Sequence, residues 1–324
     1  MKPTVIFLLF LKILYSNQPS STIPASTYSI VAYDPETGQL GVAVQSHWFS
    51  VGFLVPWAKA GVGAVATQSF VKVEYGPDGI NLMEEGFTAK EALKKLLLED
   101  KAKEVRQVSM IDTKGNVATH TGSKCIYAAG HFIGDNYSVQ ANMMEKESVW
   151  DAMSYAYENT KGDLADRLMA ALESAEKEGG DIRGKQSAAM LIVSGEPTGF
   201  SWKDIEMDLR VDDHPEPLNE LKRLIRISRA YHHANKGDYF LELNQINNAL
   251  EQYDLASSYY PENPELPYWS AVALVKTGRF NKAIPIFRNV FRKEPRLRIL
   301  IPRLVKAGLL PDHPDVITRI MNIK

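Results

Sequence analysis

Cysteine is almost absent from this chain, in which Cys125 is the only one among 324 residues. A single cysteine excludes an internal disulfide and any zinc site built from several thiolates. No cysteine follows directly after the N-terminal segment, so we expect no lipid anchor attached at that point. A free cysteine is most often a small buried apolar residue, and we interpret Cys125 in this way rather than as a reactive thiol.

The chain also lacks a large excess of charge of either sign, because its formal net charge is only −2. Its 45% hydrophobic and 23% charged residues are ordinary for globular proteins, which argues against long disorder, a multi-span membrane protein and a general nucleic-acid binder. The charge is uneven: residues 1–216 hold 20 basic and 29 acidic residues, and residues 217–324 hold 17 and 10. The length suits one large domain followed by a smaller one.

Residues 1–25 are predicted to be a signal peptide. Lys2 precedes the apolar run 5–11, and Lys12 and the run 13–15 follow, a pattern too short for a permanent bilayer-spanning helix. Residues small enough for cleavage occur at Ser16, Ala25 and Ser26. The alternative is an uncleaved anchor or a buried N-terminal strand. We expect export to a periplasmic or extracellular location, without stable membrane insertion.

After the predicted leader, apolar residues recur with the spacing of strands in some segments and of helices in others. This predicts an α+β domain over residues 26–216. The predicted strands are 29–33, 40–46, 61–69, 107–112, 117–122, 137–143, 187–193 and 205–211. The predicted helices are 81–100, 148–159 and 164–178.

Residues 61–66 fit the G-x-G-x-x-A spacing of a dinucleotide-binding turn, which requires a helix to open at the second glycine. Instead, β-branched residues continue through Val65 and Thr67, and the glycines and proline of residues 76–79 follow, so no helix opens. We therefore interpret Gly61 and Gly63 as strand glycines that permit close backbone approach.

Many short segments in colinear order resemble one bacterial family. They are Thr27–Ala32, Asp34–Gly38, Gly61–Gln68, Tyr75–Pro77, His120–Gly122, Ala129–His131, Val139–Met143, Gly179–Asp181, Arg183–Gly184, Gln186–Ala188 and Leu209–His214. The family is catalogued as domain of unknown function 1028 and grouped with the N-terminal-nucleophile (Ntn) hydrolases. The resemblance implies a four-layer αββα sandwich and an uncharacterised hydrolase.

In that superfamily the nucleophile heads the first strand, so the resemblance selects Thr27. An N-terminal hydroxyl residue carries its own base, because its α-amine titrates near pH ~8. Cleavage after Ala25 would expose Ser26, and cleavage after Ser26 would expose Thr27, so both nucleophiles stay open. From the pattern alone, Thr27 is an ordinary residue at the start of a strand.

Four further polar residues are candidates for a site that takes a small amide or peptide substrate. Gln68 and Asn142 could donate to an oxyanion, or could simply satisfy buried backbone groups. Asp181 and Arg183 could bind substrate charge, since an arginine gives two parallel bonds to a carboxylate.

No metal or cofactor is expected. Asp212 and His214 could share one face of a strand, but Pro215 and Pro217 favour a strand end that leads into a linker. His120 and His131 lack any metal-ligand spacing.

Residues 217–324 are predicted to form a small all-α domain that resembles tetratricopeptide repeats. An offset of 34 aligns Gly237 with Ala271, Phe240 with Leu274, Ala249 with Ala283, Tyr253 with Phe287, Ala256 with Val290 and Pro261 with Pro295. The two repeats, about 230–263 and 264–297, are fewer than the usual three, so the flanking segments are expected to cap them or to dock on the first domain. Ten basic residues and one acid, Glu294, lie between Lys276 and Lys306. They form either a solvated face or a docking surface for an acidic peptide or wall polymer.

Two functions remain open on these grounds. One is an exported Ntn-type amidohydrolase, with the helical repeats recruiting substrate or partner. The other is a non-catalytic scaffold that binds peptides or proteins through the repeats. A homo-oligomer is compatible with either.

Overall fold

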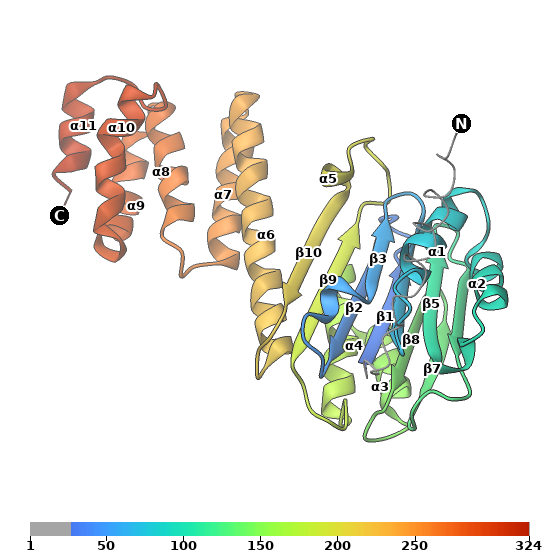
Figure 1. Cartoon of the computed structure of the whole chain (residues 1–324). Coiled ribbons are helices and arrows are strands. Elements are labelled where there is room, and N and C mark those ends of the chain that lie inside the picture. Colours follow the sequence, from blue (N-terminus) through green and yellow to red (C-terminus); the bar gives the residue numbers. More distant parts are fainter. Residues whose placement is uncertain (1–26, 324) are drawn as a thin grey trace, which may run out of the picture. The chain divides into compact units, whose positions relative to one another are not determined.

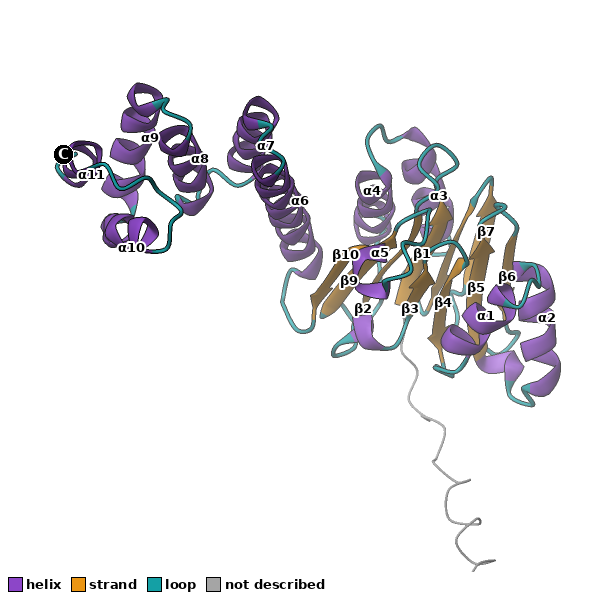
Figure 2. Cartoon of the chain, turned by 90° about the horizontal axis from the view of Figure 1, so that it is seen from above, coloured by secondary structure: helices purple, strands orange, loops and turns teal. Residues whose placement is uncertain are grey.

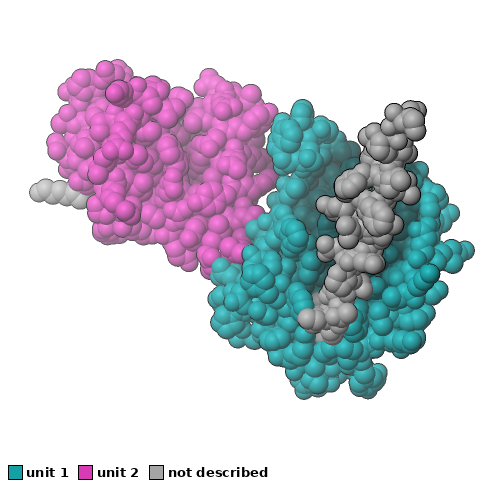
Figure 3. Space-filling model, viewed as in Figure 1, with its two compact units in different colours: residues 1–222 teal, residues 223–324 magenta. Residues whose placement is uncertain are grey.

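The computed structural model describes residues 27–323, so the predicted leader and Ser26 lie outside the described residues. The chain divides into two compact units between Lys222 and Arg223 (Figure 3). The predicted domain boundary lies slightly earlier, at residue 217, where helix α6 (Pro217–Glu242) begins. Within residues 27–323, no helix combines the length and the apolar character that crossing a bilayer requires.

The first unit contains two antiparallel sheets (Figure 1). In spatial order, the larger sheet consists of β10 (Ile205–Val211), β9 (Ser187–Val193), β2 (Leu40–Ser46), β1 (Thr27–Tyr33), β8 (Tyr137–Asn142) and β7 (Gly130–Gly134). The smaller sheet consists of β3 (Pro56–Lys59), β4 (Gly63–Ser69), β5 (Arg106–Asp112) and β6 (Val117–Thr121). Strand β1 lies inside the larger sheet, where Thr27 pairs with Ser46 on one side and with Asn142 on the other.

Helices pack on the outer faces of both sheets (Figure 2). Helices α1 (Tyr75–Glu84) and α2 (Ala89–Glu99) contact strands of the smaller sheet, and α3 (Val149–Asn159) and α4 (Leu164–Lys177) contact strands of the larger one. The inner faces meet through contacts of β1 with β4 and β5. The predicted mixture of helices and antiparallel strands, followed by a helical C-terminal region, is thus confirmed.

The core between the sheets changes character along the strands. Val31, Val44, Ala64 and Ile111 belong to one buried apolar cluster. In β1, the residues two and four positions before Val31 are Ser29 and Thr27, and both are buried polar residues. Because alternate residues of a strand share a face, the apolar and polar parts occupy the same inter-sheet layer.

The predicted helix 81–100 is wrong in its bounds, because it consists of two helices. Gly86 adopts a φ of +98° after α1, and Thr88 then caps α2 through a capping box with Glu91.

Residues 76–79, which we interpreted as evidence against a helix after Gly63, form the first turns of α1. Pro77 is tolerated there because the first N–H groups of a helix have no intrahelical partner. Gly76 lies against the ring of Trp57, which a Cβ atom would approach to 2.3 Å. Strands β3 and β7, by contrast, occupy stretches for which no strand was predicted.

The second unit is entirely helical. It contains most of α6, then α7 (Ile246–Tyr259), α8 (Glu265–Lys276), α9 (Phe280–Lys293), α10 (Leu300–Lys306) and α11 (Pro314–Met321). Two pairs of residues 34 positions apart are fully or almost fully buried in it: Ala249 and Ala283, and Tyr253 and Phe287.

Candidate functional site

Thr27 is the first residue of β1 and has no exposed surface. Its Oγ1 donates a hydrogen bond to Ser46 Oγ at 3.2 Å, across the β1–β2 pair. The hydroxyl that the family resemblance selects as nucleophile is therefore held beside a second hydroxyl at the end of the strand pair.

Gln68 and Asn142 converge on Thr27 from the other sheet and from β8. Gln68 Nε2 donates to the Thr27 carbonyl oxygen at 3.0 Å, and Asn142 Nδ2 lies 3.4 Å from the same oxygen. Both nitrogens also donate to Gln107 Oε1, at 2.7 and 3.0 Å. The structure thus brings three predicted residues together, but the two amides bind the Thr27 backbone and would have to exchange partners to donate to an oxyanion.

Gln107 is a central residue of this site that the sequence did not indicate. Its Nε2 donates to Thr121 Oγ1 at 2.9 Å and to the carbonyl oxygens of Gly130 and Ala141 at 3.1 and 2.9 Å. The available signal was the pair of polar residues Gln107 and Ser109, two positions apart in a strand whose other interior residues are Val108, Met110 and Ile111.

A chain of hydrogen bonds continues from Gln68 into the space between the sheets. Ser29 Oγ donates to Gln68 Oε1 at 2.6 Å, and Gln140 Nε2 lies 3.2 Å from Ser29 Oγ. Ser109 Oγ in turn donates to Gln140 Oε1 at 2.9 Å. Buried polar groups are costly unless they are hydrogen-bonded, and these side chains satisfy one another across both sheets.

The backbone is strained directly after both amide residues. Ser69 and Met143 follow Gln68 and Asn142 and have φ angles of 70° and 58°. A left-handed conformation costs a residue other than glycine about 1–3 kcal/mol and is concentrated at functional sites. The two turns end β4 and β8 where the amides reach Thr27.

Asp181 lies at the same end of the larger sheet. Its Oδ2 accepts from the backbone N–H of His47 at 3.1 Å, and its backbone forms a bridge with Met144. His47 follows Ser46, the partner of Thr27 in β2, so Asp181 lies just beyond the start of β1.

Arg183 pairs with Asp181 instead of presenting an open guanidinium fork. Arg183 Nη2 lies 2.9 Å from Asp181 Oδ2, and Nε lies 3.1 Å from Oδ1. The Asp181 side chain has no exposed surface. A role in substrate binding would require this bidentate pair to open or to act as one unit.

Three buried polar groups near the start of β1 have no hydrogen-bond partner among the described residues. They are the side-chain amide of Gln45, His47 Nδ1 and Asn142 Oδ1. Gln45 pairs with Tyr28 in the sheet, and Asn142 pairs with Thr27. Unsatisfied polar atoms are rare in protein interiors, which makes this end of the sheet distinctive.

His120, His131 and Cys125 have local partners. His120 Nε2 lies 2.9 Å from the Lys103 carbonyl oxygen, and His131 Nδ1 lies 2.8 Å from Thr121 Oγ1. Cys125 is half-buried, and burial raises the pKa of its thiol. No group of three or more metal-ligating His, Cys, Asp or Glu side chains occurs within residues 27–323.

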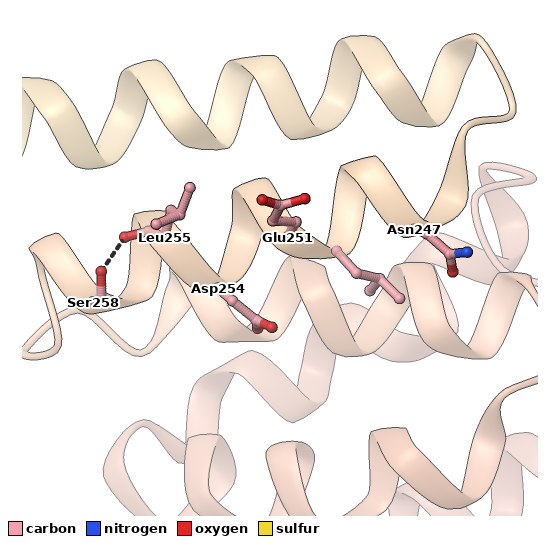
Figure 4. A pocket seen from close by; sticks show the side chains of 6 residues that line it. Asn247, Glu251, Asp254, Leu255 and Ser258 are labelled. Atoms are coloured by element: carbon pink, nitrogen blue, oxygen red, sulfur yellow. Dashed lines mark hydrogen bonds between the residues drawn. The ribbon is translucent and has the colours of Figure 1, made fainter.

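The second unit has a cavity of about 480 Å³ along α7. Figure 4 shows Asn247, Glu251, Asp254, Leu255 and Ser258 along this helix, with Ser258 Oγ donating to the Leu255 carbonyl oxygen at 2.7 Å. Burial raises the pKa of the Asp254 carboxyl group. The lining combines two leucines with Asn247, Ser258 and the carboxylates of Glu251 and Asp254, and it contains no basic residue, unlike the segment between Lys276 and Lys306.

The family match found by comparison with known proteins covers the first unit alone. The crystal structure of a protein from Silicibacter pomeroyi, described as a member of the DUF1028 family, is similar with a TM-score of 0.56 and 29% sequence identity. The similarity covers 62% of this chain and 85% of that chain. Among curated proteins no match is found. The family described as a family of unknown function, DUF1028, matches residues 27–221. Through these residues the chain belongs to the DUF1028 family.

Proposed function

We propose that the first unit is an exported Ntn-type amidohydrolase whose nucleophile is Thr27, exposed by removal of the leader. The observation that carries the proposal is the position of Thr27. It is the first residue of both β1 and the family match, and the side-chain amides of Gln68 and Asn142, from separate strands, lie against its carbonyl oxygen.

The layering of the first unit supports this assignment. Helices contact the outer face of each sheet, and the sheets contact each other, as a four-layer αββα sandwich of Ntn type requires. In such a fold the first strand must begin at the site, and β1 lies inside the larger sheet rather than at its edge.

The chemistry follows from a free Thr27. Its Oγ1 would form a bond to the carbonyl carbon of a small amide or peptide, while the α-amine accepts the hydroxyl proton. That proton would pass to the leaving nitrogen as the C–N bond breaks. Water would then hydrolyse the resulting ester and restore the hydroxyl. Gln68 and Asn142 would position Thr27 through its carbonyl oxygen, and no cofactor is needed.

The alternative is a scaffold that has lost or never had this activity and binds a peptide or protein through its helical unit. Two observations favour it: Thr27 has no exposed surface in the uncleaved chain, and Arg183 is occupied by Asp181.

The tetratricopeptide-like assignment is supported by Gly237, where a Cβ atom would meet the Tyr253 ring at 2.7 Å. Small residues at helix crossings are typical of such repeats. An acidic polymer at the basic segment, or a second copy of the chain, would be the other partners.

The decisive experiment is N-terminal sequencing and intact mass of the exported protein, followed by labelling with a hydroxyl-directed electrophile. We expect a mature N-terminus at Thr27 and labelling of that residue. Thr27→Ala should abolish labelling and amide hydrolysis, whereas Thr27→Ser should retain both. A mature start at Asn17, or undiminished turnover by Thr27→Ala, would exclude this mechanism. Absence of labelling across a broad set of electrophiles would favour the scaffold.

A further inference from the structure

A recess of about 470 Å³ lies on the first unit between α2 and the edge strands β6 and β7. Strand β6 ends the smaller sheet and β7 ends the larger one, and Figure 2 shows α2 beside β6. The volume lies within the range of pockets that bind small molecules.

The recess combines an apolar surface with cations only. Leu98 and Ile133 line it and are 74% and 46% exposed. Its charged lining residues are Lys90, Lys94 and Lys103, and no acidic residue lines it. Residues 1–216 hold more acids than bases, so the charge of this recess is opposite in sign to the net charge of that part of the chain.

The lysines have charge available for a ligand. Within residues 27–323, neither Lys90 nor Lys94 forms an ion pair. They lie four residues apart on α2 and therefore project from the same side of the helix. Lys103 lies beside Glu104, but the Glu104 carboxylate accepts hydrogen bonds from Ser123.

The inner wall offers little further polar recognition. Thr119 lines the recess, but its hydroxyl is engaged with Ser109 and Ser138 at 2.9 and 2.7 Å. A ligand would thus meet apolar surface below and ammonium groups at the rim. A carboxylate attached to a short apolar body satisfies both, because lysine side chains can keep their charged ends at the water boundary while their stems cover apolar surface.

We infer that this recess binds a small amphiphile with a carboxylate head and an acyl or similarly apolar body. The inference is independent of the proposed hydrolase. It defines a second site, formed by α2, β6 and β7, whose selectivity lies in the sign of the ligand's charge.

The test is a titration of the full chain with octanoate, followed by the NMR signals of the Ile133 and Ala118 methyl groups. Octanol and octyltrimethylammonium serve as neutral and cationic probes with the same tail. We expect saturable shifts with octanoate and binding at least about tenfold weaker with the other two. The double variant Lys90→Gln/Lys94→Gln should weaken octanoate binding by a similar factor. Lys146→Gln/Lys161→Gln, which removes the same charge elsewhere on the first unit, should not.

Three outcomes would overturn the inference. They are the absence of saturable shifts, equal binding of the three probes, and unchanged octanoate binding in the double variant. The mass in solution of Ile133→Asp provides a further check. A fall from a dimer to a monomer would assign the exposed apolar surface to a contact between copies and would exclude the ligand site.

Discussion

Gln68 Nε2 donates to the carbonyl oxygen of Thr27 at 3.0 Å, although 41 residues separate the two along the chain. The bond joins the end of β4 in one sheet to the start of β1 in the other. Since the same nitrogen also reaches Gln107, the geometry at Thr27 depends on three strands at once. The stability of this arrangement can be measured apart from any activity.

Gln107→Leu should lower the free energy of unfolding by about 2–4 kcal/mol. The variant removes the acceptor shared by Gln68 and Asn142, and a buried polar group left without a partner costs about 1–3 kcal/mol. Urea unfolding measures the change. Gln39→Leu is the control, because Gln39 is half-exposed, and it should shift the free energy by no more than about 0.5 kcal/mol. Equal losses in both variants would show that the network contributes nothing specific.

Asp100→Asn should destabilise the first unit in a pH-dependent manner. Burial opposes the charged form of Asp100, but the Ala102 N–H and the Arg106 guanidinium outweigh burial and lower the pKa of the carboxyl group. The folded pKa is therefore below the unfolded value, so the stabilisation is present above about pH 4 and is lost as the pH falls through the folded pKa.

Urea unfolding of this variant at two pH values checks the prediction. We expect a loss of about 3–5 kcal/mol at pH 7, because Arg106 would remain buried without its partner, and a smaller loss near pH 3. Glu84→Gln breaks the exposed pair with Lys59 and should cost no more than about 1 kcal/mol. A loss for Asp100→Asn that is the same at both pH values would contradict this account.

Thr88→Ala should destabilise α2 by about 1 kcal/mol. The Glu91 N–H donates to Thr88 Oγ1 at 3.3 Å, and the Thr88 N–H donates to Glu91 Oε2 at 2.9 Å, so the variant removes half of a capping box. Amide hydrogen exchange in the first turn of α2 provides the measurement. Thr88→Ser retains the hydroxyl and should preserve protection; if it loses as much as Thr88→Ala, the cap is not the cause.

Phe287→Ala should destabilise the second unit by about 3–5 kcal/mol, because the ring is fully buried against Tyr268 and Phe291. Hydrogen exchange resolved by residue should report faster exchange in α8 and α9 than in the unchanged protein. The exposed Tyr239 serves as a control, since Tyr239→Ala removes a ring that is 57% exposed. Equal loss of protection in β1 would show that the two units unfold as one.

Most of the first unit could be predicted from local pattern. β2, β9 and β10 have the bounds expected from alternating or β-rich runs, because such runs carry a clear period. β7 and the start of α1 could not be predicted in this way. Gly130 and Gly134 weaken the strand signal in β7, and the glycines and proline at the start of α1 resemble a turn until the Trp57 ring is known to lie against Gly76.

The candidate site could be predicted only in part, because it depends on contacts between segments that are distant in the sequence. Resemblance to a family indicated Thr27, and residue type and position made Gln68 and Asn142 candidate oxyanion donors. The meeting of these three residues depends on strand register between distant segments. Gln107 was missed because a single amide within a strand forms no motif. Its role arises because β4, β5 and β8 bring Gln68, Gln107 and Asn142 together, and local sequence does not encode this meeting.

The polar layer between the sheets also restricts how the first unit can assemble. Valines and alanines of an apolar core tolerate alternative pairings, whereas a slip of β1 by one residue would turn Ser29 away from Gln68 and Gln140. The side-chain amides of Gln68 and Gln140 would then be buried without this hydrogen-bond partner, which would lower the free energy of unfolding. The layer therefore discriminates against misassembled sheets, so that a chain in which β1 has paired correctly is also one in which Thr27 has reached its position.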